Sequence, residues 1–283
     1  MQDMVPKLGV DILEWRPYLV ALRLISPMHI GWRKIGNVQQ TRPYVSGRNI
    51  WGALTSRLVR DQGDSNYEAI GRSVDEELRF TYFYPSFSPE KIDIWPWGNS
   101  LDYYSWNYLK SYVSTALNDK TAEDSALHET EFISPRSRKG CPVYLVGYLF
   151  EREDCILRWK KALEQLQLGG ERGYGWGRTQ INSEPKLSDK CFDHDILKNG
   201  SSPTIKMTTN ACVLAHVLAT STNIKGCIEP LVGRITSERS GFGGEISKAN
   251  ICWAPGSCIK KDSLFRIRPK GIWEECPNRH ILA

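Results

Sequence analysis

The amino-acid sequence predicts an α+β protein with two parts, a larger one that alternates strands with helices and a smaller one that is rich in strands. The chain has 283 residues, which is enough to bury a substantial core. Apolar residues make up 41% of it and charged residues 24%, which is the composition of a globular protein. The predicted elements follow one another as strand, helix, strands, helix and strand, which is the order of a ferredoxin-like sheet.

The larger part begins with a strand and a helix. Residues 18–25 (YLVALRLI) form an apolar run typical of a strand, and a polar loop is expected to follow as far as residue 44. Ser46 is the expected N-cap of a helix over 46–60, because apolar side chains recur there at helical spacing from Ile50 onward. After a turn-prone segment, aromatic residues predict strands near 78–84 and 91–95. Residues 103–117 are a further helix candidate.

A second apolar strand is predicted at 142–150 (PVYLVGYLF), and Asp154 is expected to cap a helix that ends at Gly169–Gly170. The glycine-rich run GGERGYGWGR then leads into a strand near 178–182. These elements define a first domain over 1–183. Residues 184–204 are polar and contain Gly, Pro and Ser, so we expect a linker there. The smaller β-rich domain, 205–283, has predicted strands near 211–219, 226–235, 251–254 and 264–268.

Composition also limits the function classes. No stretch approaches 18 consecutive apolar residues, and residues 1–15 carry acids where a signal peptide has an apolar region, so we expect neither a membrane span nor secretion. The eight cysteines include no C-x-x-C pair, which favours reduced thiols over disulfides or zinc. Four of the five histidines, His128, His194, His216 and His280, have no spacing typical of metal ligands. We therefore predict no metal and no cofactor.

The positive charge is concentrated near the N-terminus. From Arg16 to Arg60 there are eight basic residues and no acid, whereas the rest of the chain has 29 basic and 32 acidic residues. Such a block is a candidate contact surface for a phosphate backbone. The alternative is a solvated face whose acids come from elsewhere in the fold.

The glycine-rich run argues against a nucleotide cofactor. A dinucleotide-binding loop follows a strand and precedes a helix, and here the predicted order is reversed; no Gly-Lys-Ser/Thr closes the run either. Its glycines can bring the backbone close to a polymer, while Arg172 and Arg178 add charge and Tyr174 and Trp176 offer faces for unstacked bases. The alternative is a helix end followed by a bulge whose aromatic residues belong to the core.

Several short motifs resemble the RAMP superfamily of CRISPR effector proteins. SPMHIG, RPYVSGRNIWGAL and GGERGYGWGR cover about residues 18–60 and 140–183. In the second part, IEPLVGR (228–234), GFGG (241–244), WAPGS (253–257) and FRIRPKGIW (265–273) are similar to the subunits of type III effectors, III-D-like above all, that bind the five-prime handle of the guide RNA. The resemblance implies ferredoxin-like domains of the RNA-recognition-motif kind, the second smaller and RAMP-like.

The resemblance implies three possible roles. A subunit that cuts target RNA carries an Asp after the first strand, and residues 26–45 contain no acid, so this role is disfavoured. A guide-processing endoribonuclease often uses a His as general acid and base, and His29 is the only His near the basic block. The third role is non-catalytic: binding the repeat-derived handle and capping the filament of backbone subunits. We predict this role, with the endoribonuclease and a scaffold protein that binds no RNA as alternatives.

The candidate RNA-binding residues lie in four segments, because single-stranded RNA is held by aromatic stacking, by Arg and Lys and by backbone amides. No catalytic residue is assigned. The candidates are His29, Trp32, Arg33, Lys34 and Arg42 in the first loop, Ser46, Gly47, Arg48 and Asn49 at the helix start, Arg136, Arg138 and Lys139 in the loop 134–140, and Gly170, Arg172, Gly173, Tyr174, Gly175, Trp176 and Arg178 in the glycine run. The loop 134–140 has a second interpretation, a charged hairpin tip.

The predicted partners are the guide RNA through its five-prime handle, the backbone subunits and the large polymerase-like subunit of the effector complex. The chain is accordingly expected to act as part of a cytoplasmic hetero-oligomer, without contact to a membrane. Aromatic residues are enriched at protein interfaces, so Trp95, Trp97 and Trp106 are candidate contacts there, or else core residues.

Overall fold

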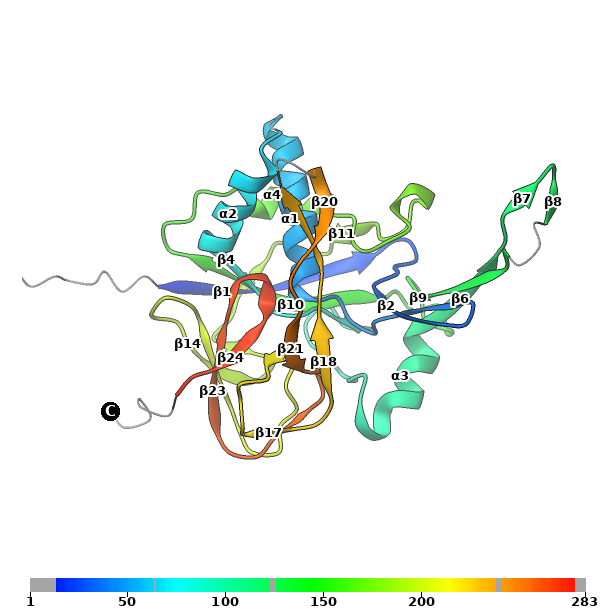
Figure 1. Cartoon of the computed structure of the whole chain (residues 1–283). Helices are drawn as coiled ribbons and strands as arrows, with labels where there is room; N and C mark the ends of the chain where they lie inside the picture. The colour runs from blue at the N-terminus through cyan, green and yellow to red at the C-terminus, as the bar shows by residue number, and fades with distance from the viewer. Residues whose placement is uncertain (1–13, 64, 123–125, 238–240, 278–283) are drawn as a thin grey trace, which may run out of the picture.

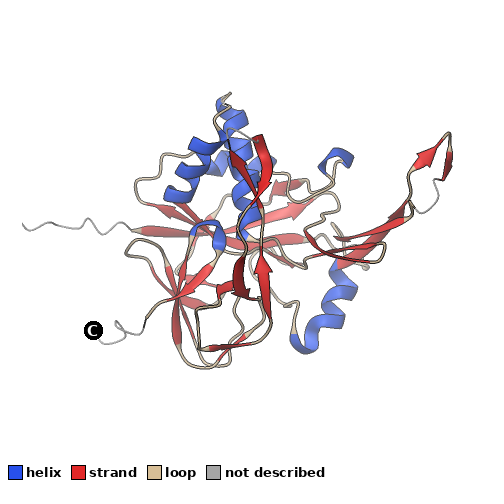
Figure 2. Cartoon of the chain, viewed as in Figure 1, coloured by secondary structure: helices blue, strands red, loops and turns tan. Residues whose placement is uncertain are grey.

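The computed structural model describes residues 14–63, 65–122, 126–237 and 241–277. Residues 1–13, which carry most of the segment expected to lack a secretory signal, lie outside that description. The described chain is mixed α+β, with many short strands and a few helices, which confirms the predicted class (Figure 2). No helix among the described residues is both long and apolar enough to cross a membrane.

The main sheet joins strands that are far apart in the sequence. Its order is β11–β1–β10–β4 with all neighbours antiparallel, while β12 also pairs with β1 and β5 with β10. The strands predicted near 18–25, 78–84, 142–150 and 178–182 are therefore present. The members of the sheet are β1 (Trp15–Leu24), β4 (Leu78–Phe80), β5 (Tyr84–Ser86), β10 (Tyr144–Arg152), β11 (Thr179–Ile181) and β12 (Lys186–Leu187).

One face of the main sheet packs against helices. Alternate residues of β1 from Tyr18 to Leu24 join the same buried cluster as Leu54 and Leu58 of the predicted first helix, because successive side chains of a strand point to opposite faces. In Figure 1 these helices lie together above the sheet. They are α1 (Gly47–Gln62), α2 (Tyr67–Glu77) and α4 (Trp159–Ala162), and α4 continues into a short 3-10 turn at Leu163–Gln165.

The opposite face of the main sheet packs against the C-terminal part of the chain. Tyr82, Tyr84 and Phe150 belong to one buried cluster with Phe265 and Trp273 from that part, so the two parts share a core. The larger C-terminal sheet has the order β13–β14–β15–β23–β24–β16–β21–β18. The C-terminal strands are β13 (Lys190–Cys191), β14 (His194–Leu197), β15 (Thr204–Met207), β16 (Val217–Leu218), β17 (Ile224–Lys225), β18 (Ile228–Leu231), β19 (Arg234–Ser237), β20 (Gly241–Ile246), β21 (Asn250–Trp253), β22 (Cys258–Ile259), β23 (Ser263–Ile267) and β24 (Trp273–Glu275).

A third sheet, of order β2–β3–β9–β6, projects from the side of the molecule and carries a two-stranded tip (Figure 1). Helix α3 lies beside it. These elements are β2 (Gly31–Ile35), β3 (Val38–Thr41), α3 (Leu101–Tyr108), β6 (Leu109–Ser114), β7 (Leu117–Asn118), β8 (Thr121–Ala122) and β9 (His128–Ile133).

This third sheet corrects two predictions. The polar loop expected up to residue 44 contains the hairpin β2–β3, whose first strand is exposed at every position and therefore has no apolar alternation to reveal it. The helix expected over 103–117 ends at Tyr108, because the chain turns extended at Leu109 and pairs with β9.

Three further predictions differ from the structure. Helix α2 follows the turn-prone segment 60–66 and fills a stretch for which the sequence predicts no element, and the side chain of its N-cap Asn66 accepts a hydrogen bond from the Ala69 amide. Residues 91–95 form no strand, although Ile92 and Trp95 pack on the second core. The helix expected after Asp154 begins only at Trp159, since the Asp154 carboxylate pairs with Arg152 at 2.5 Å.

The segment 184–204 differs from the predicted linker. It contributes β12 to the main sheet and β13 and β14 to the C-terminal sheet, and β15 begins at its last residue. Cys191 within it is fully buried. The polar composition that suggested a linker is that of short strands with one exposed face.

Candidate nucleic-acid interface

A groove of about 790 Å³ lies where five segments of the chain meet. Its walls come from the start of the hairpin β2–β3, the N-terminal half of α1 with Arg42 before it, the beginning of the glycine run, and residues 230–234 and Gly243 of the C-terminal part. Four arginines line it, and no Asp or Glu does among the residues that the structure describes. They are Arg42, Arg48, Arg172 and Arg234.

Arg48 is the most enclosed of the three groove arginines that have no carboxylate partner. Its side chain packs tightly on Gly233, where an added Cβ would come within 2.2 Å of Arg48 Nη1. Nη1 donates to Ser247 Oγ at 3.2 Å, whereas the buried Nε has no partner among the described residues. Burial lowers the pKa of Arg48, yet a guanidinium remains charged in proteins, so an unsatisfied cationic donor lies in the groove wall.

Arg172 and Arg234 are exposed and come from two different segments of the groove lining. Arg172 begins a 3-10 turn, Arg172–Tyr174, in the glycine run. Arg234 begins β19, and its Nη1 donates to the Gly243 carbonyl at 3.2 Å. Within the described ranges, no carboxylate lies within 4.0 Å of the Arg48, Arg172 or Arg234 guanidinium. Asp75 acts on Arg48 from beyond that distance and is paired with Lys270 at 3.0 Å, so all three guanidiniums are without an ion-pair partner of their own.

Arg42 has different surroundings. Its Nη1 lies 2.8 Å from Glu229 Oε1 and 3.0 Å from the Tyr44 hydroxyl. The same carboxylate accepts from Trp32 Nε1 at 3.3 Å and from His216 Nε2 at 2.5 Å. Burial alone would raise the pKa of Glu229, but the hydrogen bond from His216 and the charge of Arg42 lower it to about 2. Burial lowers the pKa of His216, so the imidazole is neutral and accepts from the Tyr82 hydroxyl at 2.6 Å.

The start of α1 contributes Ser46, Arg48 and Asn49 to the groove. Ser46 is the N-cap, as predicted, but its hydroxyl donates to Asn49 Oδ1 at 2.6 Å and makes no capping bond. Gly47 faces the other way: an added Cβ there would come within 2.7 Å of Gly271 Cα. Backbone contact with the C-terminal part therefore sets the position of this helix end.

The glycine run is shaped by contacts within the protein. A Cβ at Gly169 would lie 2.3 Å from the His29 carbonyl oxygen, and one at Gly177 would lie 1.8 Å from that of Leu168. The amides of Gly170 and Gly177 donate to His29 and Pro27 carbonyls at 2.8 and 2.6 Å. These amides, which glycine content suggested for phosphates, are thus occupied. Glycine is needed at positions 169 and 177 because the backbone there is closely packed and has a left-handed conformation.

His29 lies under this run. Its side chain is 7% exposed, and Nδ1 donates to the Glu131 carbonyl at 2.7 Å. The imidazole therefore joins the turn after β1 to β9, the backbone carbonyl of His29 accepts from Gly170, and His29 is not among the groove residues.

The aromatic candidates differ in their surroundings. Trp32 is 42% exposed, and Arg33 lies over its ring at 4.1 Å from the centroid. Tyr174 is 84% exposed at the tip of the glycine run. Trp176 packs edge-on against Phe132 of β9, with the centroids 5.1 Å apart.

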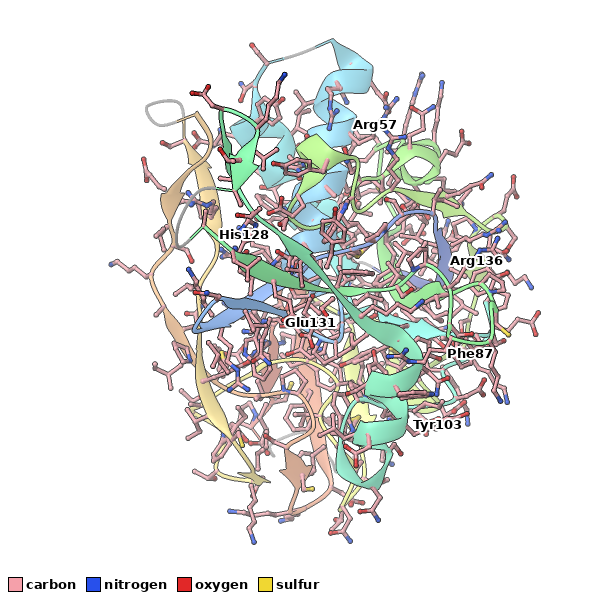
Figure 3. The ribbon with its side chains drawn as sticks, turned by 90° about the vertical axis from the view of Figure 1, so that its right-hand side faces the viewer. Arg57, Phe87, Tyr103, His128, Glu131 and Arg136 are labelled. Carbon is pink, nitrogen blue, oxygen red and sulfur yellow. The ribbon has the colours of Figure 1, made fainter. Side chains whose placement is uncertain are left out.

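The loop 134–140 belongs to another region. Arg138 lies over the Trp106 ring at 3.9 Å and donates to the Trp106 carbonyl, while Arg136 donates to Gly140 within its own loop. With residues of α3, β6 and β9, Arg138 lines a second cavity of about 650 Å³ that also has three carboxylates, Asp102, Glu129 and Glu131. Figure 3 shows Arg136, Glu131 and Tyr103 on this side of the molecule.

The structure thus gathers some of the predicted residues and leaves others apart. Trp32, Arg42, Ser46, Arg48, Asn49 and Arg172 line one groove. Arg33, Lys34, Tyr174 and Arg178 are exposed outside its lining, as are Arg136, Arg138 and Lys139 in the second region. Sequence reasoning about single residues missed Gln167, Trp51 and Arg234, although Arg234 closes the motif IEPLVGR. No cluster of potential metal ligands occurs among the described residues.

Comparison with known proteins assigns a family. Residues 21–180 match the model of the RAMP superfamily. No curated protein sequence matches the chain. A chain in a cryo-EM structure of the Type III-B Cmr-beta bound to cognate target RNA is 11% identical, with a TM-score of 0.39 over 59% of this chain and 96% of that one. A chain in the same assembly bound to cognate target RNA and AMPPnP, state 1, is 11% identical, with a TM-score of 0.47 over 87% and 86%.

Proposed function

Because this chain belongs to the RAMP superfamily, we propose that it is a non-catalytic subunit of a type III CRISPR ribonucleoprotein that binds the repeat-derived five-prime handle of the guide RNA and caps the backbone filament. The observation that carries the proposal is the groove with four arginines and no acid among its described lining residues. A nucleic-acid backbone is recognised by such cationic surfaces, and the adjoining Trp32 offers a face for an unpaired base.

The main sheet supports a ferredoxin-like assignment. Its order β11–β1–β10–β4 is antiparallel throughout, and α1 and α4 pack on one face while following the first and third of these strands in sequence. This is the βαββαβ arrangement, with the second strand split into β4 and β5. On this assignment the groove lies at the side of the sheet, between its first helix and the C-terminal part.

The proposed partners are the guide RNA, the backbone subunits and the large polymerase-like subunit of a cytoplasmic complex. The two cavities suggest a division of these contacts. The acid-free groove suits RNA, while the second cavity combines carboxylates with the exposed Trp106 and suits protein.

The non-catalytic role rests on the surroundings of His29. A general base must reach the 2′-hydroxyl of the RNA, whereas His29 is buried and bonded to a backbone carbonyl. The turn after β1 also has no acid between residues 26 and 45.

The test is the incubation of the full-length chain with repeat RNA without metal, combined with binding measurements over a salt series. We expect binding that weakens steeply as salt rises, no cleavage, and unchanged RNA in the His29→Ala control. Specific cleavage that disappears in His29→Ala would show the endoribonuclease instead. No RNA binding, alone or in a reconstituted complex, would leave the scaffold role.

A further inference from the structure

We propose that Glu229 withdraws Arg42 from phosphate binding and holds Trp32 as a fixed platform for a base. The groove then holds RNA phosphates through Arg48, Arg172 and Arg234 alone. Glu229 is a positioning residue in this proposal, and the proposal rests on the RNA-binding function above. It reverses the simplest interpretation of the sequence, in which each arginine of the basic segment is a phosphate ligand.

The first argument is the pairing of Arg42. Its charge lies 2.8 Å from Glu229 Oε1, and the two side chains are only 13% and 21% exposed. Salt screens such a partly buried pair far less than a surface pair. If Arg42 left Glu229 for a phosphate, a partly buried carboxylate would lose its counter-charge, which is a strongly unfavourable change.

The second argument is that the carboxylate is itself held. Besides Arg42, it receives hydrogen bonds from His216, whose side chain is fully buried, and from Trp32. His216 in turn accepts from Tyr82 in the shared core. Glu229 is therefore anchored to the protein interior and cannot rotate away when RNA binds.

The third argument is the contrast with the other groove arginines. No carboxylate of the described residues lies within 4.0 Å of Arg48, Arg172 or Arg234, and Arg48 Nε is buried without a partner. The Asp75 carboxylate acts on Arg48 from beyond 4.0 Å and is itself paired with Lys270 at 3.0 Å. These three guanidiniums therefore gain a charged partner when a phosphate enters, whereas Arg42 would have to give up an existing one.

Trp32 completes the arrangement. Its indole N–H is fixed by Glu229 Oε2 at 3.3 Å, and Trp32 remains 42% exposed at the groove even with the Arg33 guanidinium 4.1 Å from the ring centroid. An aromatic ring that is already fixed loses less conformational entropy when a base stacks on it. One acidic residue from the C-terminal part thus removes a phosphate ligand and orients a stacking ring.

The test measures the slope of log affinity against log salt for a labelled single-stranded oligouridine and full-length variants. Each lost phosphate contact reduces this slope by about 0.7. We expect that reduction for Arg48→Gln. The charge-neutral double variant Arg42→Gln/Glu229→Gln should keep the wild-type slope. Glu229→Gln alone should make the slope steeper by about 0.7, because Arg42 is then free to bind a phosphate. Glu229→Asp keeps the negative charge and should therefore have the wild-type slope.

A double variant whose slope falls like that of Arg48→Gln would overturn the proposal, since Arg42 would then be a phosphate ligand. An unchanged slope in Glu229→Gln would also overturn it. If Glu229→Gln does not fold, as judged by thermal melting, the double variant and Glu229→Asp decide. Absence of salt-dependent binding by the wild-type chain would instead remove the proposed function itself.

Discussion

The groove between the two parts of the chain and the cavity beside α3 both have arginine in their walls, yet acidic residues line only one of them. Among the described residues, the groove has four arginines and no carboxylate, whereas the cavity beside α3 combines Arg138 with Asp102, Glu129 and Glu131. Both regions were predicted to bind RNA from their basic sequence. The comparison shows that a basic segment becomes an anion site only where the tertiary structure leaves its charge uncompensated.

The largest expected difference in RNA binding between the two regions comes from removing the three groove arginines that have no ion-pair partner. Arg48→Gln/Arg172→Gln/Arg234→Gln should weaken RNA binding by on the order of 100-fold, because each charge-assisted contact contributes about 1 kcal/mol or more. The matched variant Arg136→Gln/Arg138→Gln/Lys139→Gln, which also removes three positive charges, should bind within about twofold of wild type. Fluorescence anisotropy at fixed salt measures both. Equal losses would mean that total charge, not the groove, governs binding.

One glycine beside each region shows a similar contrast, because the glycine near the groove is closely packed and the one near the cavity beside α3 is not. Gly177 and Gly140 both have positive φ, at +76° and +81°, but a Cβ meets the Leu168 carbonyl oxygen at Gly177 and open space at Gly140. Gly177→Ala should cost about 3 kcal/mol of unfolding free energy, and Gly140→Ala about 1 kcal/mol from backbone strain alone. Urea denaturation measures the two values. Similar losses would contradict the packing role assigned to the glycine run.

Lowering the pH should reduce the unfolding free energy of the protein through Glu229, the carboxylate that pairs with the groove residue Arg42. Its pKa is about 2 in the folded chain, below the ordinary value of 4.5, so the unfolded state binds more protons as the pH falls. Its contribution, about 3 kcal/mol, is present above pH 4.5 and is lost as the pH falls toward 2. Glu229→Gln should flatten the dependence of unfolding free energy on pH over that range. Glu129→Gln, from the other cavity, is the control, and a flattening of the same size there would refute the assignment.

The smallest expected effect concerns the two exposed tryptophans. Trp32→Ala should weaken RNA binding by roughly tenfold without changing its salt slope, because base stacking contributes about 1–3 kcal/mol and involves no counterions. Trp106→Ala, which removes a 60% exposed ring from the acidic cavity, should leave binding unchanged. Titrations at several salt concentrations separate the two. A loss in Trp106→Ala would place RNA on both regions.

What could be predicted from the sequence is the part that local pattern determines. The strand β1 and the helix α1 follow from apolar periodicity, and the approach of the first loop, the helix start and Arg172 follows from family motifs. Helix α2 was missed because Asn66 and its polar neighbours suggest a turn as readily as a helix start. The strand expected at 91–95 failed because Ile92 and Trp95 bury themselves from an irregular segment.

The candidate site shows a sharper limit. Nothing local distinguishes Arg42 from Arg48, because the residue that does so, Glu229, lies about 190 positions away and reaches Arg42 only through the C-terminal sheet. The same holds for Arg234, which becomes a groove residue only when β18 and β19 pass beside α1. Charge compensation is a property of the tertiary structure, so sequence spacing alone could not reveal it.

The close contact between Gly47 and Gly271 has a consequence for the order in which this chain matures. The helix end that carries Arg48 rests on a turn formed by Pro269–Gly271, only a few residues before the last strand, β24. Closing so long a loop is slow, and synthesis proceeds from the N-terminus. A nascent chain can therefore form its main sheet early, but its groove is completed only after residues 269–271 have been synthesised. Copies that stop before Pro269 would then lack the finished groove and compete poorly for RNA.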